Sequence, residues 1–349
     1  MPLTNTKRKY KKRKSKFNFR KTQKKSMRQK RGGGGDNEPA PAPAAAGAAA
    51  GAAAGAAAAK NTFKKAKCAP QTNKNKELQK FTCYSEKDLF RMRDQWNARR
   101  KDALIATSVP KEIWENLKKK MENACHNEAC WLKQKFAENN LAHDKELVNY
   151  TFAPKSPEKW KVNHTTWLNS TDIEKVMKQY EHAYPCFRFI GPTPIDFDAQ
   201  VYENQCVWND LCKFNLATYV NAKPPVNKIG IIFNTDPHDK SGAHWISMFI
   251  NLKKKFIFFF DSNGTPIPKQ INEFKNRVVA QALKLYNLRL TFDTNEGNAH
   301  QKGNTECGMY SLYLIVSLLK DTHTYNFFKE SKITDKAMEH LRDEYYNSE

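Results

Sequence analysis

Four residues in the last third of the chain have side chains that together suit acyl transfer: His244, Asp261, Gln301 and Cys307. An imidazole beside a carboxylate is held in one tautomer and stays available as a base. A cysteine thiol needs such a base in order to attack a carbonyl carbon. We expect Cys307 to be the nucleophile, His244 the base and Asp261 the group that orients it. The side-chain amide of Gln301, with the backbone N–H of Cys307, would stabilise the oxyanion.

Each of these residues has an ordinary structural explanation when it is taken alone. A histidine at the start of a strand is more often structural, and a cysteine before an apolar helix is more often part of the core. The run Asp-Ser-Asn-Gly at 261–264 has the composition of a turn. The order His, Asp, Gln, Cys is far more specific than any one member, so the set favours a catalytic interpretation.

Three strand-like runs in quick succession must position the histidine and the aspartate, at 228–234, 245–251 and 255–261. A charged turn near Lys253 joins the last two, so these should be antiparallel neighbours. The start of one strand then lies beside the end of the other. The pattern therefore predicts that His244 and Asp261 are adjacent.

An apolar helix over about 307–319 should begin at the cysteine. Unpaired N–H groups and the positive end of the helix dipole stabilise a thiolate at such a position. Further helices are expected over 268–285 and after a cap at Ser170 or Thr171, with a strand at 288–292. Helices segregated around a short sheet indicate an α+β fold.

These motifs resemble those of the adenovirus-protease and SUMO-protease-like cysteine peptidases, over about residues 160–320. They stand in this chain as His244-Trp245, Phe260-Asp261-Ser262, Gln301 six positions before Cys307-Gly308, and Trp167-Leu168-Asn169. The resemblance implies the papain-like, adenain-like cysteine protease fold, in which helices flank a short central sheet. It also implies the catalytic roles that we assign above.

The resemblance further implies a set of substrate-binding residues. In the family, the positions of Trp167 and Trp245 clamp an extended Gly-Gly stretch in a narrow tunnel. Asn169 and Gly308 stand in the same motifs, and we count them with the substrate-binding residues. A side chain on either glycine of the substrate would collide with the indole rings.

The segment 305–311 most resembles virion-maturation proteases of large nucleocytoplasmic DNA viruses, whereas cellular deconjugases usually have Asp in place of Glu306. This implies an endopeptidase that cleaves after Gly-Gly-like sites in viral structural polyprotein precursors. The expected location is the virion and the host-cell cytoplasm, with the nucleus as an alternative. Removal of a ubiquitin-like modifier of the SUMO type would use the same residues and stays open. Acyl transfer to another acceptor is a weaker alternative.

The chain has 349 residues, and its 59 Lys and Arg exceed its 36 Asp and Glu. Most of the surplus lies in the first 80 residues. We expect residues 1–35 to be a disordered polybasic arm and 36–80 to be an Ala/Gly/Pro-rich and Lys-rich linker. Residues 7–31 suit a solvated tail, a nuclear-localisation-like signal or a nucleic-acid contact. A packaging protein that binds nucleic acid and keeps the protease fold only as a scaffold is therefore a further hypothesis.

Residues 81–155 are expected to form a helical N-terminal accessory domain, and 156–349 the catalytic domain. Apolar residues recur at helical spacing in the former, as at Leu89, Met92 and Trp96. The uncharged run at 40–59 consists mostly of Ala and Gly, which contribute little transfer free energy. We therefore expect no membrane span.

No secretory signal is visible, so we expect an intracellular chain whose eight cysteines are mostly free thiols. Cys125 and Cys130 could suggest zinc, but no second compact pair accompanies them. Buried structural thiols are the better interpretation of these two. The chemistry of the catalytic set requires no metal and no cofactor, and we expect neither.

Overall fold

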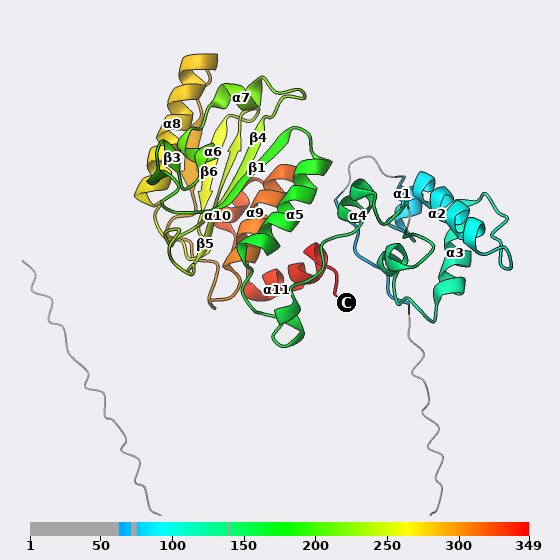
Figure 1. Cartoon of the computed structure of the whole chain (residues 1–349). Coiled ribbons are helices and arrows are strands. Elements are labelled where there is room, and N and C mark those ends of the chain that lie inside the picture. The colour runs from blue at the N-terminus through cyan, green and yellow to red at the C-terminus, as the bar shows by residue number, and fades with distance from the viewer. Residues whose placement is uncertain (1–62, 71–74, 139, 349) are drawn as a thin grey trace, which may run out of the picture. The chain divides into compact units, whose positions relative to one another are not determined.

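A computed structural model describes residues 63–70, 75–138 and 140–348 of the chain (Figure 1). The polybasic arm, its segment 7–31, the run at 40–59 and most of the predicted linker lie outside these residues. Among the described residues, no helix is both long and apolar enough to cross a bilayer. Buried side chains form three hydrophobic cores, two on the faces of a sheet and one among the N-terminal helices.

The sheet has five strands in the order β1-β4-β5-β6-β7. They are β1 (Phe187–Pro194), β4 (Lys228–Asn234), β5 (Trp245–Asn251), β6 (Phe256–Phe260) and β7 (Thr291–Thr294). The β4–β5 and β5–β6 pairs are antiparallel, and the two outer pairs are parallel. The three successive strands are thus confirmed.

The strand predicted at 288–292 begins later, at Thr291. The reason lies in the preceding helix α8 (Lys269–Tyr286), which ends at Asn287 in a left-handed conformation. The N–H of Leu288 still donates to the carbonyl of Ala282, 3.0 Å away. Leu288 therefore belongs to the helix terminus and is not free to join the sheet.

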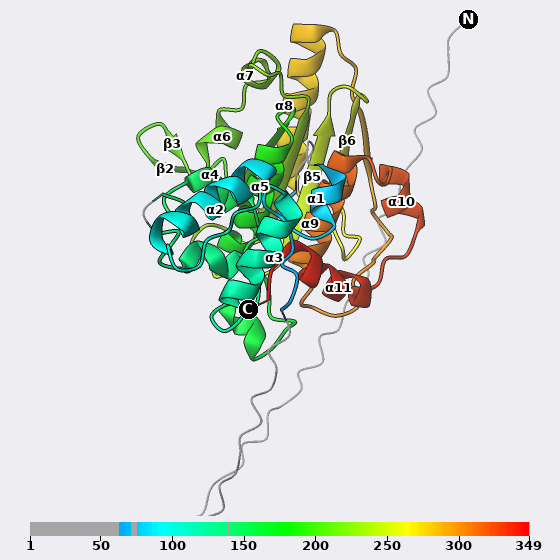
Figure 2. The ribbon, with the colours of Figure 1, turned by 90° about the vertical axis from the view of Figure 1, so that its right-hand side faces the viewer.

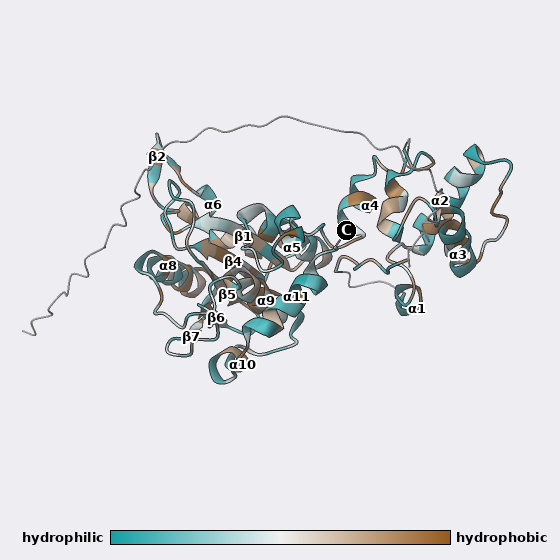
Figure 3. Ribbon diagram, turned by 90° about the horizontal axis from the view of Figure 1, so that it is seen from below, coloured by the Kyte–Doolittle hydropathy of each residue, from teal (hydrophilic) through white to brown (hydrophobic). Residues whose placement is uncertain are grey.

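Helices cover both faces of the sheet. α5 (Ser170–Ala183) and α9 (Cys307–Lys320) pack on one face, and α8 packs on the other with the short helices α6 (Asn209–Cys212) and α7 (Leu216–Val220). α10 (Tyr325–Glu330) and α11 (Asp335–Tyr345) follow α9, and α11 packs beside it (Figure 2). Apolar residues concentrate in the sheet and α9 (Figure 3). This arrangement confirms the α+β fold with a central sheet flanked by helices.

The cap of α5 differs from the prediction of Ser170 or Thr171. Asn169 is the N-cap, and its side-chain oxygen accepts from the N–H of Asp172 at 2.9 Å. The Asp172 carboxylate in turn accepts from the N–H of Asn169, at 3.1 Å. This reciprocal capping box requires a side chain three positions after the cap that can accept from the backbone of the cap, and Asp172 supplies it to Asn169, whereas Ser170 has Ile173 at that spacing.

The N-terminal helices have a core of their own, centred on Trp131, Leu89 and Ile113. The elements are α1 (Lys76–Gln79), α2 (Glu86–Arg99), α3 (Pro110–Met121), the 3-10 helix η1 (Glu128–Lys133) and α4 (Lys145–Tyr150), with η2 (Glu158–Lys161) after them. The helical prediction for this region is confirmed. Its start at residue 81 is wrong, because Phe63 and Ala66 pack into the same core. The predicted linker therefore includes residues that fold with the helices.

Six of the eight cysteines are paired, as Cys68–Cys83, Cys125–Cys130 and Cys206–Cys212. The prediction of mostly free thiols, including buried thiols at 125 and 130, is wrong for these six. Each pair is close in sequence, and the fold brings its Cα atoms to between 5.2 and 6.3 Å, within the range that a disulfide spans. Composition and compartment do not reveal such local geometry. Cys186 and Cys307 remain unpaired.

Candidate active site

The β5–β6 hairpin brings the first two candidate residues together. Ser247 pairs with Phe260 across the two strands. His244, just before β5, and Asp261, just after β6, therefore lie at the same end of the hairpin. There His244 Nε2 lies 2.6 Å from Asp261 Oδ1, and the two side chains are 16% and 3% exposed. The predicted adjacency is confirmed. It follows from the hairpin alone, because a tight turn fixes the register.

The Asp261 carboxylate is held by more than the imidazole. Its oxygens also accept from the Asn263 N–H, at 2.8 Å, and from the Thr265 hydroxyl. Asn295, which is buried, fixes the backbone on either side by bonding the N–H and the C=O of Asp261. Burial acts to raise the pKa of Asp261, but the imidazole and these donors outweigh it and hold the pKa below its ordinary value.

Cys307 is the first residue of α9 and is buried. Its side chain lies near enough to His244 to act on the pKa of the imidazole. Since Nε2 of the imidazole faces Asp261, Nδ1 is the atom left to face the sulfur. Burial alone would lower the pKa of His244, but the hydrogen bonds and charges of Asp261 and Cys307 outweigh burial and raise the pKa to about 9. The imidazole is therefore protonated at neutral pH, as a thiolate–imidazolium pair requires.

Gln301 lies in the loop between β7 and α9 and is hydrogen-bonded to Ser262, the residue after Asp261. Ser262 Oγ donates to Gln301 Oε1 at 2.8 Å, and the backbone N–H of Gln301 donates to the carbonyl of Ser262 at 2.9 Å. Gln301 Nε2 donates to the carbonyl of Gly303 at 3.0 Å. These contacts occupy the acceptor and one amide proton. The second proton of Nε2 stays available for a substrate oxygen.

The four predicted substrate-binding residues differ in exposure. Trp167 is 39% exposed, whereas Trp245 is only 8% exposed and its indole N–H donates to the carbonyl of Leu168 at 2.9 Å. Asn169 caps α5, as described above. Gly308 is buried, and a Cβ built on it would lie 3.2 Å from Leu168 and 3.3 Å from Trp245. The glycine thus allows the start of α9 to approach the Trp167-Leu168 segment closely.

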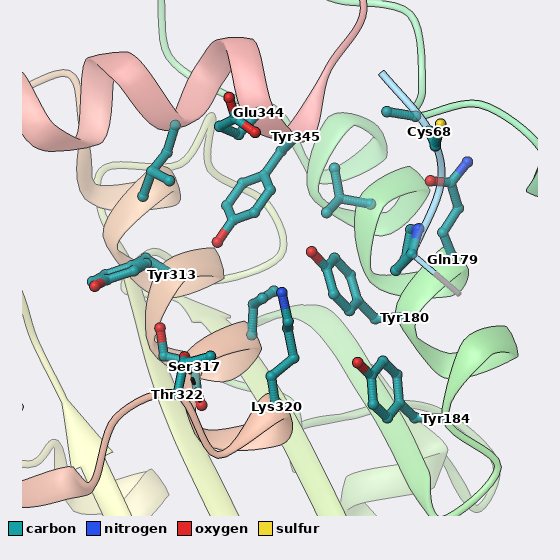
Figure 4. A pocket seen from close by; sticks show the side chains of 15 residues that line it. Cys68, Gln179, Tyr180, Tyr184, Tyr313, Ser317, Lys320, Thr322, Glu344 and Tyr345 are labelled. Atoms are coloured by element: carbon teal, nitrogen blue, oxygen red, sulfur yellow. Dashed lines mark hydrogen bonds between the residues drawn. The ribbon is translucent and has the colours of Figure 1, made fainter. Parts of the chain in front are cut away.

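Two cavities of the described part lie away from these residues. One, of about 400 Å³, is lined by α5, the second half of α9 and α11, with Tyr180 and Tyr345 extending into it (Figure 4). Lys320, on its wall, ends the helix that Cys307 begins, roughly 20 Å of helix away. The other, of about 1050 Å³, is lined by residues of the N-terminal helices and α5. Neither of these two cavities is lined by a catalytic candidate.

Sequence reasoning missed the residues that support the site from behind. Asn295 and Thr265 hold Asp261, and Arg342, in α11, pairs with Glu306 at the residue before the nucleophile. Thr265 follows a turn-forming run and could have been considered from spacing. Arg342 lies far along the chain in a charged helix, and no local pattern distinguishes it from its neighbours. Among the described residues, no group of three or more His, Cys, Asp and Glu could hold a metal ion.

A thiol at the start of a buried helix, in contact with an imidazole that a carboxylate holds, defines a cysteine peptidase. Residues 218–349, which include all four catalytic candidates, match the Ulp1 protease family, C-terminal catalytic domain. The family resemblance expected from the motifs is thus confirmed.

Two similar proteins come from large DNA viruses. A protein of Acanthamoeba polyphaga mimivirus that carries the name of a thiol protease is 28% identical over 221 residues, which cover 62% of this chain and 68% of that protein. A cysteine protease of African swine fever virus is 29% identical over 253 residues, covering 69% of this chain and 90% of that protein. A crystal structure of a protease from the latter virus matches with a TM-score of 0.56 at 23% identity, over 82% of this chain and 97% of that one. That likeness concerns the fold.

Proposed function

We propose that this cysteine peptidase is an endopeptidase that cleaves viral structural polyprotein precursors after Gly-Gly-like sites during virion maturation. The observation that carries the proposal is the hydrogen bond between His244 and Asp261, in a place where Cys307 also acts to raise the pKa of the imidazole. The similarity to a viral cysteine protease over most of its length supports the viral setting.

In the first half of the reaction, the Cys307 thiolate attacks the scissile carbonyl carbon and a carbon–sulfur bond forms. The imidazolium of His244 gives its proton to the leaving nitrogen as the carbon–nitrogen bond breaks, which leaves a thioester and a free amine. In the second half, neutral His244 takes a proton from water, and the resulting hydroxide attacks the thioester. The carboxylate product leaves, and the thiolate–imidazolium pair forms again.

The oxyanion of each tetrahedral intermediate needs donors that are already in place. The backbone N–H of Cys307, at the start of α9, is one of the groups that a helix leaves unpaired. The remaining Nε2 proton of Gln301 is the other. Removing one such donor costs about 3 kcal/mol in comparable sites, and the Ser262 contact keeps the Gln301 amide in the required orientation.

The preference for glycine follows from the tryptophans. Trp245 is buried and fixed to Leu168 by its N–H, so its ring has little freedom to move aside for a substrate side chain. Trp167, which precedes Leu168 in the chain, is the exposed ring that we propose closes over the substrate. In this proposal, a ring on either side of the substrate admits a backbone without side chains.

Purified full-length protein and synthetic peptides test the proposal. A peptide with Gly-Gly before the scissile bond should be cleaved, and replacement of the second glycine by Val should abolish turnover. Cys307→Ala should be inactive, while Cys186→Ala, the matched control at the other unpaired cysteine, should cleave normally. Equal rates on the Gly and Val peptides would overturn the specificity, and a cleaving Cys307→Ala protein would overturn the mechanism.

Removal of a ubiquitin-like modifier is a second candidate, favoured by one observation. Some isolates of African swine fever virus have a 29% identical relative that is named SUMO-1 cysteine protease. The same catalytic residues would act on a folded modifier that ends in Gly-Gly. A modifier fusion cleaved much faster than a free peptide with the same last residues would favour this candidate, because the gain would come from the modifier surface.

The basic segment 7–31 adds a proposed interaction with nucleic acid, supported by its charge alone. The proposed location in the virion and the host-cell cytoplasm, with the nucleus as an alternative, depends on the proposed function in the same way.

A further inference from the structure

The most deeply buried charge pair of the described residues lies directly behind the nucleophile. Arg342 and Glu306 have side chains that are 0% and 2% exposed. The guanidinium binds the carboxylate with two parallel hydrogen bonds, Nε to Oε2 at 2.9 Å and Nη2 to Oε1 at 2.8 Å. Glu306 is the residue before Cys307 and the N-cap of α9. Arg342 therefore holds the backbone from which the nucleophile projects.

The same guanidinium also binds the backbone of the segment that leads to Trp167. Nη1 donates to the carbonyl of Thr166 at 2.9 Å, and Nη2 donates to the carbonyl of Thr305 at 3.3 Å. The central carbon of the guanidinium, Cζ, lies 4.5 Å from the centre of the Trp160 ring. Thr166 precedes the exposed Trp167, so one side chain connects the tryptophan segment to the cysteine segment.

The helix that carries Arg342 makes a second contact with the site. Asp335, at the start of α11, accepts from the N–H groups of Lys302 at 3.1 Å and Gly303 at 2.8 Å. These residues follow Gln301, the proposed oxyanion donor. α11 thus holds the loop on both sides, after Gln301 and before Cys307.

We propose that Arg342 is a positioning residue: it acts through Glu306 and Thr166 to hold the nucleophile and the tryptophan wall at a fixed separation. This inference rests on the proposed function for the roles of Cys307 and Trp167. A buried ion pair is a poor source of stability, because apolar residues of the same volume often stabilise a core equally well. What the guanidinium adds is a planar fork with five donors, which lysine cannot reproduce.

Arg342→Lys separates positioning from stability, because it keeps the charge and removes the fork. We expect kcat on a Gly-Gly peptide, and the rate at which iodoacetamide alkylates Cys307, to fall about tenfold or more at temperatures where the variant is folded. Arg277→Lys is the matched control, since Arg277 also binds a carboxylate, that of Asp198, and two carbonyls, at a distance from the site. The control should keep both rates, whatever its thermal stability.

Chemical rescue and an isosteric variant complete the test. Free guanidinium at millimolar concentration should restore alkylation and turnover to Arg342→Ala and have no such effect on the wild type. If the substitutions at 342 do not fold, Glu306→Gln, which preserves size, should show the same two losses. A folded Arg342→Lys with normal kcat and alkylation rate would overturn the inference. A wild type that cleaves no Gly-Gly peptide while Arg342→Lys still slows alkylation would instead refute the proposed substrate.

Discussion

Replacing Asp261 by Asn removes a negative charge from the imidazole and changes little else in shape. In the wild type, His244 has a pKa of about 9, against an ordinary value of 6.5. Since burial alone acts to lower that pKa, the neighbouring charges and hydrogen bonds supply the whole increase. At about 1.4 kcal/mol for each pKa unit, the net increase favours the imidazolium by roughly 3 kcal/mol, and the neighbouring groups supply at least that much because they also offset burial.

The sign of the effect follows from the direction of this pKa. A raised pKa keeps His244 protonated, and the thiolate–imidazolium pair intact, until the pH rises through about 9. At pH 7.5, about 97% of the imidazole is then protonated. If Asp261→Asn returns the pKa to 6.5, about 9% is protonated at that pH, which is roughly a tenfold loss of the reactive pair.

The assay is the rate of iodoacetamide alkylation at Cys307, followed by mass spectrometry from pH 5 to pH 10, together with kcat/KM on a Gly-Gly peptide. We expect the alkaline limb of the wild-type kcat/KM profile near pH 9, because turnover needs the imidazolium, and in Asp261→Asn at least two pH units lower. Alkylation needs only the thiolate and should not fall above pH 9. Thr265→Val is the control, because it removes one donor to the carboxylate and leaves the charge. If the alkaline limb stays near pH 9 in Asp261→Asn, Asp261 does not set the protonation state of the His244 imidazole, and the prediction is wrong.

Two further substitutions address the support of the site and the arm. Asn169→Ala removes the cap of α5 and should lower the free energy of unfolding by about 1 kcal/mol, measured by urea denaturation. Asn169→Ser should recover most of that stability. A loss of kcat at a temperature where Asn169→Ala is fully folded would indicate substrate contact instead. Deletion of residues 1–59 should leave peptidase activity unchanged while abolishing salt-dependent binding to a DNA duplex, measured by fluorescence anisotropy. Unchanged DNA affinity after the deletion would show that the arm is not the segment that binds DNA.

The sequence predicted the parts of the site that depend on local order. His244 and Asp261 are adjacent because a four-residue connection, 252–255, forces two strands to pair in one register. Cys307 begins a helix because an apolar run starts there. These relations extend over a few residues of chain, where alternation and turn composition carry the information.

Other parts depend on contacts that no local pattern contains. Arg342 meets Glu306 across 36 positions, in a helix whose charged residues otherwise face solvent or lie half-buried. The disulfides were missed for a different reason, because compartment is a weak guide to whether two neighbouring cysteines meet across a turn. In both cases the three-dimensional fold decides which residues pair, because the residue types alone are compatible with several pairings.

Four stretches of the chain form the site, and they divide the work. The hairpin 244–265 and the loop 295–308 supply the groups that would exchange protons and bonds, while the segment 165–169 and α11 hold those groups in place. Substitutions of the ionisable groups His244, Asp261 and Cys307 in the first two stretches should therefore change the pH dependence of the reaction. Substitutions in the last two should lower its rate without moving the pH limbs, because they alter distances and leave the charges around His244 unchanged.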